Sequence, residues 1–170
     1  MTALIVTESL FGNTLAIAEA IGSGIAEVRG RGSVRVLHAS QAPAALPADV
    51  DLLVVGAPTH TLSMPNAGTR DNAARKGAPE PPRPGIREWI QTVRIPEGVG
   101  VATFDTSIHS RIQLGTAARA AARALRRRGT QAAVGPSFWV TGMEGPLADG
   151  ELARATGWGR TLAERVAAAR

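Results

Sequence analysis

Six consecutive residues near the start of the chain, Ser9-Leu10-Phe11-Gly12-Asn13-Thr14, combine groups that bind anions. They separate an apolar run, Leu4-Ile5-Val6, from a stretch with helical periodicity, so they form the turn at which a helix begins. The free N–H groups and the dipole of a helix N-terminus attract a phosphate group. The hydroxyl and amide side chains of the turn add donors, and its glycine lets the backbone approach closely. The pattern predicts a phosphate site.

Three common phosphate-binding motifs do not fit this turn. A Walker A motif requires a lysine directly after its second glycine, and the only lysine of the chain is Lys76. The dinucleotide motif fails because Gly22-Ser23-Gly24 lies inside the expected helix and Glu27 stands where a third glycine is needed. A phospho-receiver domain needs an aspartate at the end of the third strand, which here ends Gly56-Ala57-Pro58. One alternative stays open, in which Asn13 only caps the helix.

Five candidate strands alternate with helical stretches, although the helical signal between the second and third is weak. The strands are Ala3–Thr7, Val34–Leu37, Asp51–Gly56, Val99–Phe104 and Gln131–Thr141. The first, third and fourth are nearly continuous apolar runs, typical of central parallel strands covered on both faces. The other two are less regular, and the last contains a Gly-Pro pair, which suits an edge position. We therefore expect an α/β fold with a doubly wound, five-stranded parallel sheet, whose ligands bind at the carboxyl ends of the strands.

We expect one domain over residues 1–170, because no linker long enough to divide two domains is present. Residues 66–85 stand out, since they hold four prolines and three glycines. A loop of this length in a compact domain is usually functional or mobile. This insertion loop follows a candidate ligand loop. We consider three interpretations: a lid, a contact with a partner, or a disordered segment.

Three segments together carry a resemblance to a known family. Val6–Ala18 resembles the phosphate loop of the flavodoxin family, Ser/Thr-x-x-Gly-x-Thr-x-x-x-Ala. Gly56–His60 resembles the second flavin loop of that family, and Phe104–Ser107 resembles the third. The resemblance implies strand order 2-1-3-4-5 and non-covalent FMN, with its phosphate on the first loop and its ring between the other two. The site residues that it implies are Ser9, Leu10, Phe11, Gly12, Asn13, Thr14, Pro58, Thr59, His60, Thr61, Phe104, Asp105, Thr106, Ser107 and His109.

The same resemblance implies a flavoprotein that handles electron transfer. Flavodoxins that act as carriers are acidic, which disfavours the reduced anionic flavin, whereas this chain has a net charge of +5 and a pI near 11.3. We therefore expect electron transfer to a small acceptor such as a quinone, as in an FMN-dependent oxidoreductase, rather than a low-potential carrier. The alternative is a flavodoxin-like scaffold that has lost its flavin and acts as a protein-interaction module.

The composition of the chain excludes or disfavours several other kinds of site and protein. The absence of cysteine excludes disulfides, thiolate metal sites and thiol catalysis, and we expect no metal. No apolar run approaches the roughly 20 residues that cross a bilayer, and no signal peptide is visible, so we expect a cytoplasmic protein without membrane contact. The basic composition only weakly suggests nucleic acid, because the arginines at 119, 123, 126 and 127 fit the solvated face of a helix and no aromatic residues lie between them. The redox partner and self-association stay open.

Overall fold

One sheet of five parallel strands organises the part of the chain that the computed structural model describes, residues 1–79, 83–109 and 115–168. Its order is β2-β1-β3-β4-β5, as expected. The strands are β1 (Thr2–Thr7), β2 (Val34–His38), β3 (Val50–Pro58), β4 (Gly100–Ile108) and β5 (Ala133–Val140). The three apolar runs form the central strands, and the two less regular segments form the edges.

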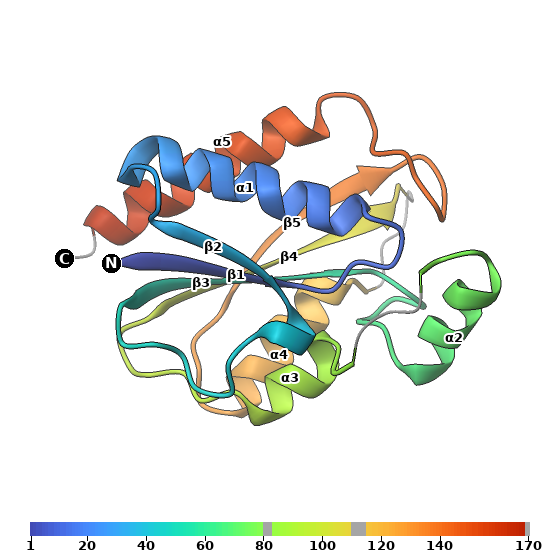
Figure 1. The fold of residues 1–170 in the computed structure, drawn as a ribbon, viewed down its shortest axis with the longest axis horizontal. Coiled ribbons are helices and arrows are strands. Elements are labelled where there is room, and N and C mark those ends of the chain that lie inside the picture. The colour runs from blue at the N-terminus through green and yellow to red at the C-terminus, as the bar shows by residue number, and fades with distance from the viewer. Residues whose placement is uncertain (80–82, 110–114, 169–170) are drawn as a thin grey trace.

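Helices cover both faces of the sheet (Figure 1). On one face lie α1 (Asn13–Arg29) and α5 (Glu151–Ala168), and on the other lie α3 (Ile86–Thr92) and α4 (Ala117–Arg127). The weak helical signal between β2 and β3 corresponds only to a short 3₁₀ turn, Ala39–Gln41. None of the described helices is long and apolar enough to cross a membrane.

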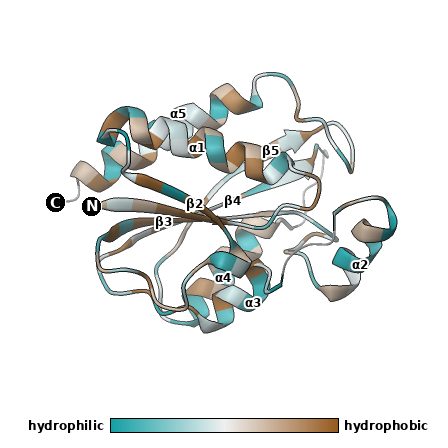
Figure 2. Cartoon of the chain, viewed as in Figure 1, coloured by the Kyte–Doolittle hydropathy of each residue, from teal (hydrophilic) through white to brown (hydrophobic). Residues whose placement is uncertain are grey.

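Two apolar clusters sandwich the sheet, and Figure 2 shows the largely apolar strands between helices of mixed hydropathy. On the α1 and α5 side, Ile5 and Val54 pack against Ile21, all with no exposed surface. On the other side, Leu53 packs in a cluster with Trp89. Because both faces are covered, the polar groups of the central strands reach solvent only at the strand ends.

Close approach between α1 and α5 explains the glycines that interrupt the first helical pattern. A Cβ on Gly24 would lie 2.0 Å from the carbonyl oxygen of Thr156, and a Cβ on Gly159 would lie 2.2 Å from that of Ile21. Gly22 instead faces the sheet, where a Cβ would lie 3.3 Å from Val34. Glycine weakens a helix interior, and here close packing compensates for that loss.

The insertion loop at residues 66–85 is not a continuous loop. It contains α2 (Ala67–Arg75), which stands apart from the sheet near the carboxyl ends of the strands (Figure 1). A capping box starts this helix: Asn66 Oδ1 accepts from the Thr69 N–H (3.0 Å), and Thr69 Oγ1 accepts from the Asn66 N–H (2.8 Å). Residues 80–82 of the expected loop lie outside the described residues.

Candidate functional site

The carboxyl ends of β1, β3 and β4 converge on a cavity of about 220 Å³. The chain passes from β1 to β2 on one side of β1 and then crosses to β3 on its other side. Ligands bind at such a switch point in the strand order. Ten of the expected site residues line the cavity: Leu10, Phe11, Asn13, Thr14, Pro58, Thr59, His60, Thr61, Thr106 and Ser107. The topology thus brings three segments that lie far apart in the sequence to one place.

The turn before α1 holds hydrogen-bond donors that have no partner among the described residues. Gly12 precedes the helix in the left-handed region (φ 87°), and no side chain of the described residues caps the helix. Space is open where a Cβ of Gly12 would lie. The Ser9 Oγ atom is buried and has no hydrogen-bond partner in the described part of the chain. Ser9 and Gly12 are not among the residues that line the cavity, but they belong to the turn that does. A turn with an unpartnered hydroxyl that leads into an uncapped helix start suits an anion.

Asn13 and Thr14 have partners that the sequence did not reveal. Asn13 Nδ2 donates to the carbonyl oxygen of Glu144 (3.0 Å), so the interpretation of Asn13 as a simple helix cap is wrong. Instead it ties α1 to the turn after β5. The Thr14 hydroxyl lies 2.7 Å from the Thr106 hydroxyl, and both residues are buried. This pair joins the start of α1 to the end of β4.

A tight turn over residues 60–63 forms a second wall of the cavity. Two backbone hydrogen bonds close it, at 2.8 and 3.1 Å between residues 60 and 63. Thr61 and Leu62 have φ angles of 49° and 63°, a region that a β-branched residue such as threonine rarely adopts. Such strain persists only where the surroundings impose it, and it clusters at ligand sites. Arg87 holds the segment that follows, binding the carbonyl oxygens of residues 64 and 65 at 2.7 and 3.1 Å.

His60 lies in this wall without carrying a stable charge. Burial lowers the pKa of His60, and the negative charge of Glu8 only partly opposes this shift. Near neutral pH the imidazole is therefore uncharged, and it offers one donor and one acceptor. Its contribution to the site is hydrogen bonding and contact area rather than a positive charge.

The third segment divides its side chains between the interior and the cavity by their position along β4, which continues to Ile108. Thr106 and Ser107 line the cavity. Phe104 is fully buried in the core, with its ring so close to Gly56 that a Cβ there would lie 2.0 Å away. The structure therefore places Phe104 beneath the site rather than in its wall.

Asp105 faces α4 rather than the cavity. Its Oδ2 atom accepts from the Ala118 N–H at the start of α4 and from the Ser137 hydroxyl, both at 3.2 Å. Burial raises the pKa of Asp105, while the hydroxyls of Thr116, Ser137 and Thr59 and the Ala118 N–H oppose the rise. This carboxyl thus positions β4, β5 and α4 against one another.

His109 lies beside the cavity, not among the residues that line it. Its ring stacks edge-on against Trp139, with 5.0 Å between the ring centroids. Trp89 and Trp158 are further away, in the two apolar clusters on opposite faces of the sheet. Phe11 is the aromatic side chain that the described residues contribute to the cavity wall.

Sequence reasoning missed the wall that α2 provides. Thr69, Asn72 and Ala73 line the cavity, and Ala73 packs with Leu10 of the turn before α1. Ile108, Val140 and Met143 complete the lining. The Asn66-x-x-Thr69 spacing was the available signal for this helix, because an Asn or Thr followed three residues later by a side chain that bonds back is a helix start.

A buried ion pair holds α2 in place. Arg70 of α2 donates from Nε to Glu8 Oε1 (2.6 Å) and from Nη2 to Glu8 Oε2 (3.1 Å), and both side chains are at most 2% exposed. Glu8 also accepts from the Ile86 N–H at the start of α3 (2.8 Å). The outer nitrogens of Arg70 bind Glu88 at 3.0 and 2.8 Å. The residue that precedes the anion-binding turn therefore anchors a helix that lines the same cavity.

Comparison with solved structures identifies the fold. The chain is similar to a flavodoxin from the domain Archaea, with a TM-score of 0.65 and 21% identity over 98% of this chain and 99% of that one. The chain has a flavodoxin-like fold. The flavodoxin of Streptococcus pneumoniae TIGR4 has a TM-score of 0.62 at 16% identity, covering 97% of this chain and 99% of its own. Oxidised flavodoxin 2 from Bacillus cereus gives the same TM-score, identity and coverage. No family model matches the sequence, and no curated protein matches it.

Within the flavodoxin-like fold, the three segments that resemble flavin loops are the three that surround the cavity. The structure brings residues of all three segments together at the cavity. It adds α2 and the turn after β5 as further walls, and it directs Phe104 and Asp105 away.

Proposed function

We propose that this chain binds FMN non-covalently in the cavity, with the phosphate at the turn before α1, and that it transfers electrons. The observation that carries the proposal is the buried Ser9 hydroxyl, which has no partner among the described residues and belongs to the turn that leads into an uncapped helix start. Each hydrogen bond to a charged group contributes about 1.5–3 kcal/mol, so several donors can anchor a phosphate without a basic side chain. The solved structures with similar folds include flavodoxins.

The residues of the chain have separate roles in this proposal. The turn before α1 binds the phosphate, while the 60–63 turn and the hydroxyls of Thr106 and Ser107 orient the rest of the ligand. Helix α2 excludes water from the side of the turn. Bound FMN supplies reversible electron transfer, and the protein supplies its position and electrostatic surroundings.

A small apolar acceptor such as a quinone suits the mouth of the cavity. Ile108 and Met143 line it and are 52% and 48% exposed, and the nearby Leu62 is 52% exposed. Exposed apolar side chains gathered at one opening favour an apolar ligand. The net charge of +5 also favours the reduced anionic flavin, which argues against a low-potential carrier.

The first expected result is that FMN binds at least about tenfold more tightly than riboflavin, because the turn before α1 binds phosphate. A fluorescence titration of flavin-free protein measures both affinities. Inorganic phosphate should compete with FMN and leave riboflavin binding unchanged. Equal affinities would contradict the phosphate site, and no binding of either flavin would favour a flavin-free scaffold.

Ser9→Ala provides the sharpest version of that titration. It should weaken FMN by about 1.5–3 kcal/mol without lowering the stability of the flavin-free protein, because the hydroxyl that it removes has no partner there. Ser23→Ala is the matched control. The Ser23 hydroxyl bonds within α1 to Glu19, on the exposed side, and its loss should leave FMN affinity unchanged.

The second expected result concerns the potential of bound FMN. With a net charge of +5 and an uncharged His60, the two-electron potential should lie near or above that of free FMN at pH 7. A dye-coupled reductive titration measures it. A potential well below that of free FMN would remove the preference for a small acceptor while leaving FMN binding intact.

A further inference from the structure

The charges of this chain are unevenly distributed along the sequence. Residues 106–143 contain six arginines and no aspartate or glutamate, namely Arg111, Arg119, Arg123, Arg126, Arg127 and Arg128. The remaining 13 basic and 14 acidic residues almost cancel. The whole net charge of +5 therefore originates in one segment, which contains α4 and β5. Such asymmetry points to an interaction surface rather than to general solubility.

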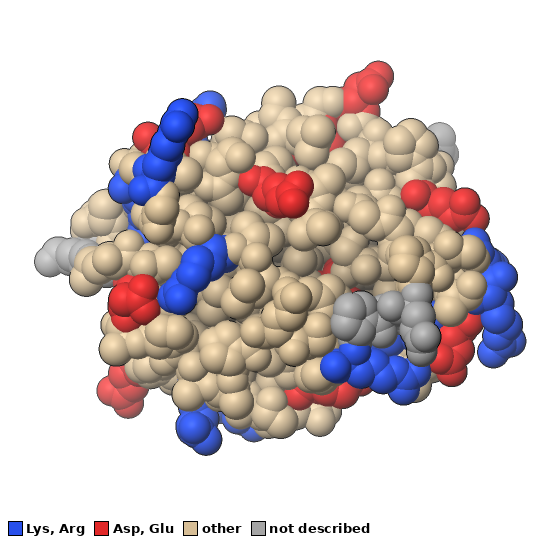
Figure 3. Space-filling view, viewed as in Figure 1, with Lys and Arg blue, Asp and Glu red and all other residues tan. Residues whose placement is uncertain are grey.

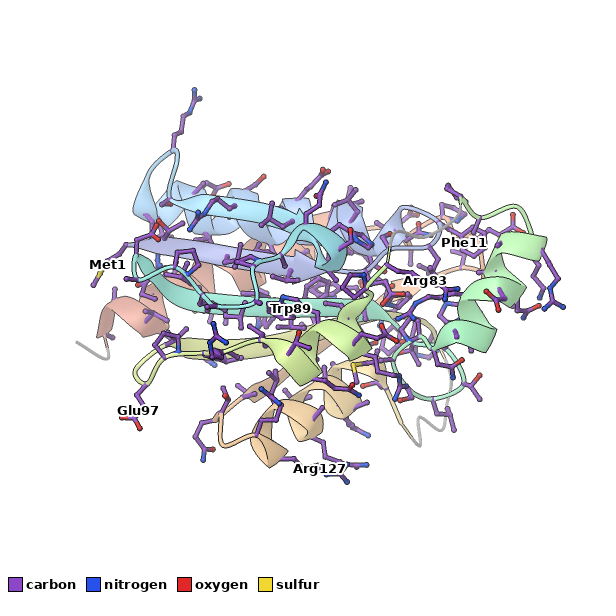
Figure 4. All side chains as sticks on the ribbon, turned by 60° about the horizontal axis from the view of Figure 1, so that its bottom comes forward. Met1, Phe11, Arg83, Trp89, Glu97 and Arg127 are labelled. Atoms are coloured by element: carbon purple, nitrogen blue, oxygen red, sulfur yellow. The ribbon has the colours of Figure 1, made fainter. Side chains whose placement is uncertain are left out.

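Helix α4 collects these arginines on one exposed face. Arg119, Arg123 and Arg127 follow one another at intervals of four residues, and Arg126 lies beside them, so the four share a stripe. On the opposite side of the helix, Ala117, Ala121, Ala122 and Leu125 pack into the core. The four arginines and Val134 of edge strand β5 border a groove. Figure 4 shows Arg127 on the outer side of α4. We call the surface formed by Arg119, Arg123, Arg126 and Arg127 the α4 stripe.

Two arginines of the α4 stripe, Arg123 and Arg127, lack charge compensation within the described residues. The ion pairs found there involve Arg29, Arg35, Arg70, Arg83, Arg154 and Arg160 instead. For Arg123 and Arg127, no carboxylate lies within ion-pair distance among the described residues, and Arg126 binds only the carbonyl oxygen of Ala132. Like charges four residues apart destabilise a helix by about 0.2–0.5 kcal/mol per pair. On the face in Figure 3, by contrast, acidic and basic side chains are interspersed.

We propose that the α4 stripe is a docking surface for an acidic protein. Guanidinium groups bind carboxylates through paired hydrogen bonds, and arginine is enriched in protein interfaces. The neighbouring edge of β5 adds apolar contact, because Ala133 and Val134 are exposed. No aromatic side chain lies among the residues that border the groove, so it lacks the stacking platforms of a single-stranded nucleic-acid site.

The helix that carries the α4 stripe begins beside the cavity. The Ala117 N–H at the start of α4 donates to the Thr59 hydroxyl (2.8 Å), and Thr59 lines the cavity. Arg126 lies near the other end of the helix and binds the carbonyl oxygen of Ala132, just before β5. A partner on the α4 stripe therefore contacts the helix whose first residue bonds to the cavity wall.

The test measures binding of a fluorescein-labelled polyglutamate peptide to flavin-free protein by fluorescence anisotropy. Arg123→Glu/Arg127→Glu should weaken binding by about tenfold or more, and salt should weaken binding to the parent. Arg31→Glu/Arg165→Glu is the matched control: both arginines are exposed and lie off α4, and the change in net charge is identical. Because the protein is flavin-free, the result does not depend on FMN binding.

Two outcomes would overturn the proposal. Equal weakening by both double variants would show that net charge alone attracts the peptide. Tighter binding of a labelled single-stranded DNA that depends on Arg123 and Arg127 would assign the α4 stripe to nucleic acid. Circular dichroism of each variant confirms that the exposed substitutions leave the fold intact.

Discussion

Replacing Arg70 by methionine should lower the free energy of unfolding by about 3–5 kcal/mol, which urea denaturation measures. The substitution leaves Glu8, which has no exposed surface, with one backbone N–H as its remaining partner. An uncompensated buried charge is far more destabilising than the loss of the pair as a whole. Glu8→Gln/Arg70→Met should therefore cost less than the sum of the two single substitutions.

Arg83→Met is the matched control for this prediction. The Arg83–Asp71 pair also involves α2, but its side chains are 61% and 54% exposed at 3.3 Å, so its loss should cost less than about 1 kcal/mol. Arg70→Met should also weaken FMN, because α2 then loses the contact that holds Thr69 and Asn72 at the cavity. If the two substitutions cost the same, Arg70 does not anchor α2.

Gly24→Ala and Gly159→Ala should each destabilise the protein by about 1–3 kcal/mol, although alanine normally stabilises a helix relative to glycine. The new methyl group would meet the backbone of the facing helix at 2.0 or 2.2 Å, so α1 and α5 must separate. Neither contact is with the end of a flexible side chain that could move aside. Thermal or urea unfolding measures the loss.

Gly157→Ala tests the same exchange where space is open. Nothing lies within 4 Å of its Cβ position in α5, so this variant should gain about 0.5–1 kcal/mol. Gly157 and Gly159 are two residues apart in one helix. A gain in stability on substitution at Gly157 and a loss at Gly159 would demonstrate the close contact directly. A gain at both positions would contradict it.

Strands and their order were predictable because burial on both faces imposes a simple pattern. The continuous apolar run around Ile5 and that around Val54 are central, as expected. The boundaries were less accurate: β4 continues to Ile108, four residues beyond the expected end at Phe104. Strand ends at a ligand site carry polar residues, so hydropathy alone does not show that the strand continues.

Helix α2 was not predictable from periodicity. Its sequence, AGTRDNAAR, has no apolar stripe, and its buried residues are Arg70 and Ala73. A buried arginine looks like any exposed arginine in the sequence, and its partner Glu8 is 62 residues away. The contact depends on tertiary structure, so the cavity wall that α2 forms was hidden as well.

The first segment of the candidate site was the most predictable, because its donors are local. The third was less so, since the side chains that line the cavity are those at the very end of β4, and this end was not predictable. Thr106 faces the start of α1, while its neighbour Asp105 contacts α4. A motif locates such a segment but does not fix the direction of each side chain.

The hydroxyl pair of Thr14 and Thr106 gives the cavity a reversible polarity. Either oxygen can donate across the 2.7 Å contact, and whichever accepts keeps its own hydrogen for another acceptor. Exchange of these roles moves the available hydrogen from the helix to the strand by rotation of two O–H bonds. The site can thereby adapt to a ligand whose protonation changes, and the backbone stays where it is.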